Sequence, residues 1–121
     1  MRAATDAALL GGVRFKYQPY LSGNSLETDL RLGMERADAI VVTGSGTGIE
    51  TSLDSITEFR SILGDFPLVV GAGITAANCA EQFAIVDAAI IGSAFKDTRK
   101  DTGSVSGAHV AEITALVKGL R

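Results

Sequence analysis

Two glycine-rich segments in this chain have residue types suited to binding an anion. Residues 71–75 read GAGIT and directly follow an apolar run, and Gly92 and Ser93 close a second apolar run that begins at residue 88. Glycine has no Cβ, so a ligand can approach the main chain and several amide N–H groups can converge on it. Thr75 could also cap the following helix, whose free N–H groups attract phosphate, so the two segments in tandem favour a phosphate site over two ordinary turns. The residues predicted to bind phosphate are Gly71, Ala72, Gly73, Ile74, Thr75, Gly92 and Ser93.

Lys16 is a second candidate for chemistry. It lies on the polar face of the alternating segment VRFKYQ, residues 13–18, where it could attract an anionic substrate, act as a nucleophilic amine, or extend into solvent. His109, the single histidine, falls in the first turn of the last predicted helix, far from the glycine segments. No His, Cys or carboxylate group has the spacing of metal ligands, so we expect no metal or cofactor.

The strands and helices that position these residues are predicted from apolar runs that alternate with helical patterns. The predicted strands are residues 13–18, 39–43, the first part of 67–83, and 88–92. The predicted helices are residues 25–36, 52–63, the second part of 67–83, and 107–119. Ser25 and Ser52 are the expected N-caps, and Gly64 follows the end of the second helix. This alternation is typical of βαβ units with a parallel sheet.

The fold class follows from the strands and from the glycines that end them. Near-continuous Val and Ile runs indicate strands buried on both faces, as in parallel sheets covered by helices. Ligands bind such sheets at the carboxyl ends of the strands, and glycine loops on two consecutive strands are the phosphate site of the last two units of a TIM (βα)8-type barrel. We therefore predict an α/β fold with about four βα units of such a barrel. Residues 1–12, with a helix-like pattern at 2–11, are expected to be the tail of a preceding unit.

The same segments resemble the carboxyl-terminal half of the BtpA family, whose members are ribulose-phosphate-binding-type barrels. The resemblance is carried by Lys16, VTGSGTG at 42–48, VGAGIT at 70–75 with Asn78, and DAAIIGSAFK at 87–96. The family is known for a protein required for photosystem I accumulation in cyanobacteria, and its enzymatic reaction is not established. Tyr17 stands where the resemblance leads us to expect a His, so no acid–base role of that His is carried over.

The resemblance implies a barrel mouth built from the ends of all four strands. Lys16 and Thr43 would be the catalytic residues near the reacting carbon. The rest of the substrate would be bound by Gly44, Ser45, Gly46, Thr47, Gly48 and Lys96. Two functions follow: an enzyme that binds a phosphosugar or inorganic phosphate, and a noncatalytic assembly or stability factor, as in photosystem I biogenesis.

The length of the chain is short for this fold. A closed barrel needs about 250 residues, whereas this chain has 121. Residues 1–121 are therefore predicted to be a single partial barrel domain with two open sheet edges. Three explanations compete: a truncated gene product, a fragment that starts at an internal Met, and a half barrel that completes itself as a homo-oligomer. We favour the first two, because residues 2–11 read as the tail of a preceding unit.

Composition limits the partners and the compartment. The net charge is −3 and the 11 Lys and Arg residues are scattered, which argues against a nucleic-acid-binding surface. The single Cys79 cannot form an internal disulfide, which suits a reducing cytoplasm. No stretch reaches the ~18 apolar residues that a membrane helix needs. We expect a cytoplasmic protein without a transmembrane segment.

Overall fold

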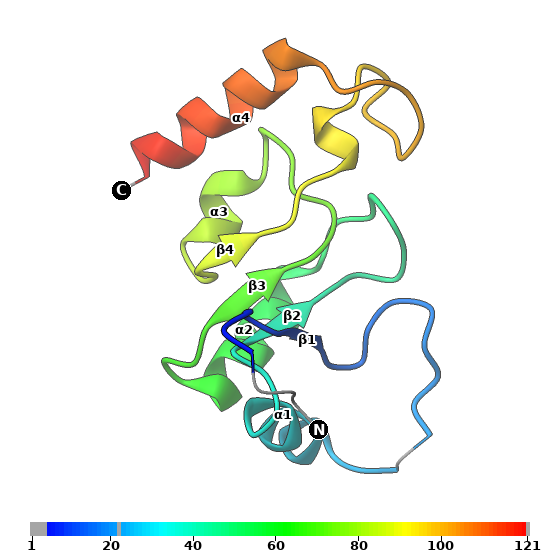
Figure 1. The fold of residues 1–121 in the computed structure, drawn as a ribbon, viewed down its shortest axis with the longest axis vertical. Coiled ribbons are helices and arrows are strands. Elements are labelled where there is room, and N and C mark those ends of the chain that lie inside the picture. The colour runs from blue at the N-terminus through cyan, green and yellow to red at the C-terminus, as the bar shows by residue number, and fades with distance from the viewer. Residues whose placement is uncertain (1–4, 22, 121) are drawn as a thin grey trace.

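Four short parallel strands form the sheet of the structure, a computed structural model that describes residues 5–21 and 23–120 (Figure 1). The strands are β1 (Leu10–Gly12), β2 (Ala39–Val42), β3 (Leu68–Val70) and β4 (Ala88–Ala89). Their order in the sheet is their order in the chain, β1-β2-β3-β4. Val42 lies beside Val70, and Val70 beside Ala89, so β2, β3 and β4 end at the same edge. The predicted α/β class with a parallel sheet is confirmed.

A helix follows each strand in the chain, and two of the helices begin at the predicted serine caps. The helices are α1 (Leu26–Met34), α2 (Leu53–Leu63), α3 (Cys79–Phe83) and α4 (Gly107–Gly119), with a short 3-10 helix, η1 (Ser93–Phe95), after β4. The hydroxyl oxygens of Ser25 and Ser52 accept hydrogen bonds from the N–H groups of Thr28 and Ser55. Each bond satisfies one of the free amides at a helix start, which fixes where α1 and α2 begin.

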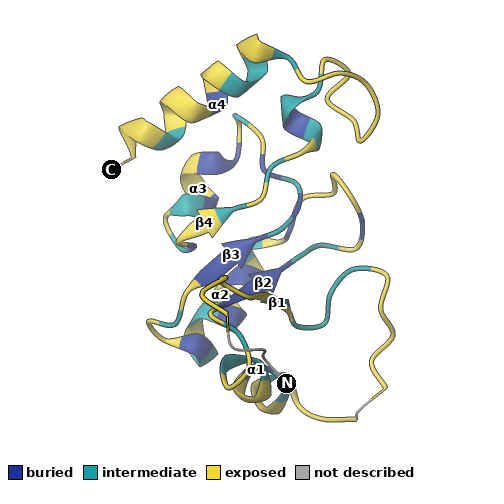
Figure 2. Ribbon diagram, viewed as in Figure 1, coloured by how far each residue is buried: buried dark blue, intermediate teal, exposed yellow. Residues whose placement is uncertain are grey.

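The main core lies between the sheet and helices α1, α2 and α3 (Figure 2). Successive side chains of a strand point to opposite faces. The buried residues on the helix-covered face are Ile40, Val42, Leu68 and Val70 from the sheet and Leu30, Ile56, Phe59, Leu63 and Cys79 from the helices. On the other face, Ala39, Val41 and Val69 are buried and pack with Phe15. Burial stabilises each large side chain in this layer by about 1.5–3 kcal/mol, so the layer sets how the helices lie on the sheet.

The first strand differs from the prediction. Residues 13–18 form a loop in which Arg14 and Tyr17 have φ of 50° and 64°, values that a strand does not allow. The alternating apolar residues of this loop pack on the two faces of the sheet. Val13 contacts the main core, and Phe15 contacts the cluster on the opposite face. The strand is β1, LGG, where a Cβ at residue 11 would lie 2.9 Å from the Cβ of Ala37.

Other predicted elements are shorter than expected or absent. The helix-like pattern at 2–11 is wrong for its described part, since residues 5–9 are irregular and residues 10–12 are β1, while residues 2–4 lie outside the described residues. Strand β4 covers two residues of the predicted 88–92. Within the described part of the chain, no helix is long and apolar enough to cross a lipid bilayer.

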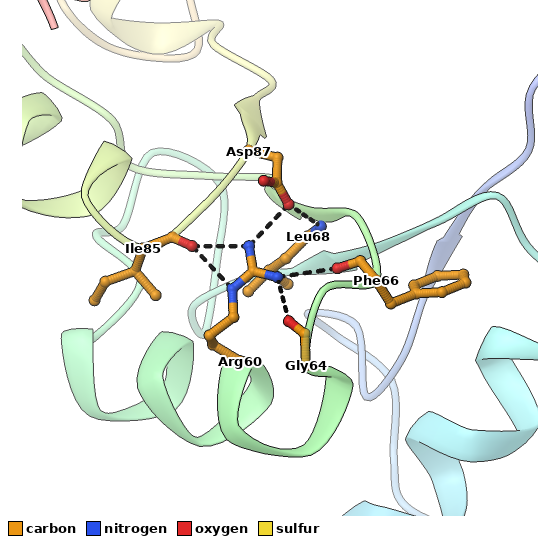
Figure 3. A network of polar contacts seen from close by, with 6 residues as sticks. All are labelled: Arg60, Gly64, Phe66, Leu68, Ile85 and Asp87. Carbon is orange, nitrogen blue, oxygen red and sulfur yellow. Dashed lines mark hydrogen bonds and ion pairs between the residues drawn. The ribbon is translucent and has the colours of Figure 1, made fainter. Parts of the chain in front are cut away.

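At the amino-terminal end of the strands, Arg60 of α2 donates hydrogen bonds to the turns that lead into β3 and β4 (Figure 3). Its guanidinium pairs with Oδ2 of Asp87 at 2.8 Å, and the same oxygen accepts a hydrogen bond from the N–H of Leu68 at 2.9 Å. The guanidinium also donates to three main-chain carbonyl oxygens, those of Gly64, Phe66 and Ile85. Asp87 thus lies just before β4, at the end of the sheet opposite the glycine segments.

Candidate functional site

A cavity of about 230 Å³ opens at the carboxyl ends of β3 and β4. Both glycine-rich segments line it, with Gly71, Ala72, Gly73, Ile74 and Thr75 from the loop after β3 and Gly92 and Ser93 from the loop after β4. Thr47 and Gly48, after β2, and Lys16, after β1, also line this cavity. The structure thus brings the seven residues predicted to bind phosphate to one cavity, which we call the anion cavity.

The charge of the anion cavity is of one sign. Among the described residues that line it, Lys16 and Arg99 are the ones with charged side chains, and no Asp or Glu is present. Cationic side chains that line a hollow surface attract anions.

Several main-chain amides of both segments have no hydrogen-bond acceptor among the described residues. The N–H groups of residues 72–74 donate to no other described residue, and neither do those of residues 92–94. On either side of the first set, the amide of Gly71 donates to the carbonyl oxygen of Val42 at 2.8 Å, and the amide of Thr75 donates to Oδ1 of Asn78 at 2.8 Å. Consecutive free amides of this kind form the concave anion sites of many phosphate-binding proteins.

The side chain of Asn78 bonds to the main chain of the first glycine segment. The predicted N-cap of the following helix, Thr75, is wrong. Helix α3 begins at Cys79 and has no side-chain cap, so Thr75 is not its N-cap. Thr75 and Asn78 instead bond to each other, because Oγ1 of Thr75 accepts the N–H of Asn78 at 3.3 Å. Nδ2 of Asn78 also donates to the carbonyl oxygen of Gly73 at 2.8 Å. These bonds fix the loop while leaving its three central amides free.

Gly73 is required by packing within the protein. Its φ is 79°, and a Cβ there would lie 2.3 Å from the Cα of Glu50 and 2.4 Å from the carbonyl oxygen of Ile49. The bare backbone at this position therefore lets the loop after β3 pack on the loop after β2. Ligand approach is not needed to explain this glycine.

The loop after β2 reaches the anion cavity and is held by Tyr17. A Cβ at Gly48 would lie 3.0 Å from Oγ of Ser93, so this loop lies against the second glycine segment. The N–H of Thr47 donates to the phenol oxygen of Tyr17 at 2.9 Å. Hydrogen bonding with Thr47 lowers the pKa of Tyr17 below its ordinary value. Tyr17, in place of the expected His, thus positions the loop that carries Thr47 and Gly48.

A second cavity of about 400 Å³ adjoins the first, and Lys16 lines both. Besides Lys16, three residues predicted for catalysis or substrate binding line this second cavity: Thr43, Gly44 and Ser45. Glu50 and Tyr17, which the sequence did not single out for the site, line it too. Oγ1 of Thr43 accepts the main-chain N–H of Lys16 at 3.0 Å, so Thr43 positions Lys16.

Two predicted residues lie away from both cavities. Gly46 is buried beneath Tyr17, where a Cβ would lie 2.9 Å from the phenol oxygen. Lys96 extends away, and its Nζ donates to the carbonyl oxygen of Gly103 at 3.3 Å. His109 bonds to the carbonyl oxygen of Lys96 through Nδ1 at 2.7 Å. Within the described ranges, no cluster of His, Cys, Asp or Glu could hold a metal ion.

Arg99 is a charged residue of the anion cavity that was not predicted from the sequence. It belongs to the polar segment between η1 and α4, which follows the second glycine segment in the sequence. The available signal was the adjacent basic pair Arg99 and Lys100. Nothing in that pair indicates which of the two side chains lies at the cavity.

Comparison with known proteins places the chain among longer relatives. A family model described as the BtpA family matches residues 2–119. An uncharacterised protein of Pyrococcus abyssi is 31% identical over 99% of this chain and 46% of its own length, and one of Pyrococcus horikoshii is 30% identical over 93% and 43%. An uncharacterised protein of Archaeoglobus fulgidus is 35% identical over 78% of this chain and 37% of its own length. No solved structure matches. The chain thus spans less than half the length of these relatives.

Proposed function

The chain belongs to the BtpA family, and from that premise we propose that it binds the phosphate group of a phosphorylated small molecule in the anion cavity. The observation that carries the proposal is the set of free amides at residues 72–74 and 92–94, which line one cavity with Lys16 and Arg99. Amide donors and cations that face a cavity without carboxylates are the arrangement that stabilises a bound dianion.

The rest of the substrate would occupy the second cavity. Lys16 lies between the two cavities, so its ammonium group can contact both the phosphate and the reacting part of a phosphosugar. We therefore retain Lys16 as the proposed catalytic residue and assign Thr43 the role of positioning it. Gly44 and Ser45 would contact the sugar portion.

We test this proposal by calorimetric titration of the full chain with inorganic phosphate. Lys16→Gln should weaken binding about tenfold or more, since it removes a charged donor. Gly92→Ala should weaken binding without loss of stability, because a Cβ there meets no described atom within 4 Å and would occupy space beside the free amides. Lys118→Gln removes a cation that does not line the anion cavity, and it should bind as the natural chain does. A noncatalytic assembly factor predicts no phosphate binding by any of the four proteins.

We further propose that the sheet is half of a (βα)8 barrel and forms one partial barrel domain. Two observations support this. The strand order follows the chain order, whereas a doubly wound sheet reverses it at a switch point. The core residues of α1, α2 and α3 all belong to the cluster on one face of the sheet, as helices do outside a barrel.

Open edges of the half barrel should lead to self-association. Leu10 of the edge strand β1 and Ile90, just after the edge strand β4, are each 49% exposed. Exposed apolar residues at unpaired edges favour pairing with another chain. We expect sedimentation equilibrium to give the mass of a dimer, with Leu10→Lys shifting it toward the monomer. A monomeric mass at every concentration would contradict this expectation.

A further inference from the structure

Arg99 lines the anion cavity and belongs to a loop that is closed by its own hydrogen bonds. The loop, residues 96–105, is closed by an antiparallel bridge between Lys96 and Val105. The N–H of Asp97 donates to the carbonyl oxygen of Ser104 at 2.8 Å, and that of Ser106 donates to the carbonyl oxygen of Phe95 at 2.7 Å. Arg99 is therefore presented by an ordered, hydrogen-bonded loop.

The backbone of Arg99 has a conformation that is costly for an L-amino acid. Its φ is 55°, in the left-handed region. Among the described residues, the other non-glycine residues with positive φ are Arg14 and Tyr17. Those two line the second cavity, and Arg99 lines the anion cavity. Backbone strain of this kind persists where the surrounding structure enforces it, and it concentrates at functional sites.

The ion pair that Arg99 makes in this structure is weak. Its Nη2 lies 3.6 Å from Oε2 of Glu112 on α4, which is beyond hydrogen-bonding distance. The two side chains are 50% and 48% exposed, so water screens their attraction. A phosphate group offers two oxygens to the planar guanidinium at once, which is the stronger interaction.

We propose that Arg99 is a ligand-binding residue of the anion cavity and exchanges Glu112 for the phosphate group. The inference rests on the proposed function and deepens it, because it names the side chain that binds the outer oxygens of the phosphate. Residues of both glycine segments line the same cavity as Arg99. Glu112 competes with the ligand for Arg99, and it therefore weakens phosphate binding.

A double-mutant cycle with inorganic phosphate tests the exchange. Arg99→Gln should weaken phosphate binding about 10- to 100-fold, as expected for the loss of hydrogen bonds to a charged group. Glu112→Gln should strengthen binding about two- to fivefold, because it removes an exposed ion pair. The double variant should bind like Arg99→Gln, because without the arginine Glu112 has no partner for which the phosphate must compete. Lys100→Gln, which removes the neighbouring charge, is the matched control and should bind as the natural chain does.

The outcomes separate this inference from the proposed function. If Lys16→Gln weakens phosphate binding while Arg99→Gln binds like Lys100→Gln, the role of Arg99 is wrong and the anion cavity stands. If Glu112→Gln strengthens binding equally with and without Arg99, its effect is general electrostatics and the exchange is wrong. If the natural chain binds no phosphate, the proposed function fails, and the inference fails with it.

Discussion

Replacing Gly73 by Ala should lower the free energy of unfolding by about 2–5 kcal/mol, the sum of a left-handed backbone penalty and an overpacking penalty. The new Cβ would lie 2.3 Å from the Cα of Glu50, which is main chain and cannot rotate away. The loops after β2 and β3 would have to separate. Urea unfolding followed by circular dichroism measures the loss directly.

Gly23 provides the control for this prediction. Its φ of 66° is also in the left-handed region, but a Cβ there meets no described atom within 4 Å. Gly23→Ala should therefore cost only the backbone penalty, about 1–2 kcal/mol. Equal losses for the two variants would show that the contact between the loops does not constrain Gly73.

Removing Arg60 should destabilise the protein by about 2–4 kcal/mol, because partly buried carbonyl oxygens would lose their donor. The Arg60 side chain is 23% exposed, and its guanidinium joins α2 to the turns before β3 and β4 (Figure 3). Arg60→Lys should recover only part of the loss, since one ammonium group cannot replace a planar fork of donors. The free energy of unfolding in urea is again the measurement.

Arg31 is the matched control for Arg60. It pairs with Glu27 one helical turn away, and the side chains are 65% and 58% exposed. Arg31→Ala should cost less than about 0.5 kcal/mol, as expected for an exposed pair on a helix. If Arg60→Ala costs no more than Arg31→Ala, the network around Arg60 does not stabilise the fold.

Lowering the pH should weaken the stabilisation that the network of Arg60 and Asp87 provides. The Arg60 guanidinium and then the N–H of Leu68 hold the pKa of Asp87 below its ordinary value of 3.8. The unfolded chain therefore binds the proton first as pH falls, so this stabilisation is complete at neutral pH and is lost as pH falls below about 4 and through the folded pKa. Arg60→Ala and Asp87→Asn should each reduce the acid dependence of unfolding.

The elements that were predictable are those whose signals are local. The strands β2 and β3 are buried on both faces, so they read as continuous Val and Ile, and the serine caps mark the starts of α1 and α2. Strand β1 gave no such signal, because its sequence LGG has low strand propensity and its position depends on pairing with β2.

Glycines marked most of the candidate site that could be predicted, and Lys16 and Thr43, which were also predicted, line the cavities. The two segments after β3 and β4 lie at one edge of the sheet, as parallel strands require, so their convergence followed from the fold class. The sequence did not reveal why residue 73 is a glycine, because that reason is a contact with a loop that is distant in the sequence. Arg99 could not be identified either, because its place at the cavity depends on the fold of its loop, and the bonds that close residues 96–105 have no evident signal in the sequence.

The measurement that tests the central claim most directly is a titration of the isotopically labelled chain with inorganic phosphate, followed by amide NMR. We predict saturable shifts of the N–H signals of residues 72–74 and 92–94, with a common dissociation constant. The amide of Thr75, which already donates to Asn78, should shift less. Shifts that do not saturate, or that avoid both glycine segments, would contradict the claim that these amides bind an anion.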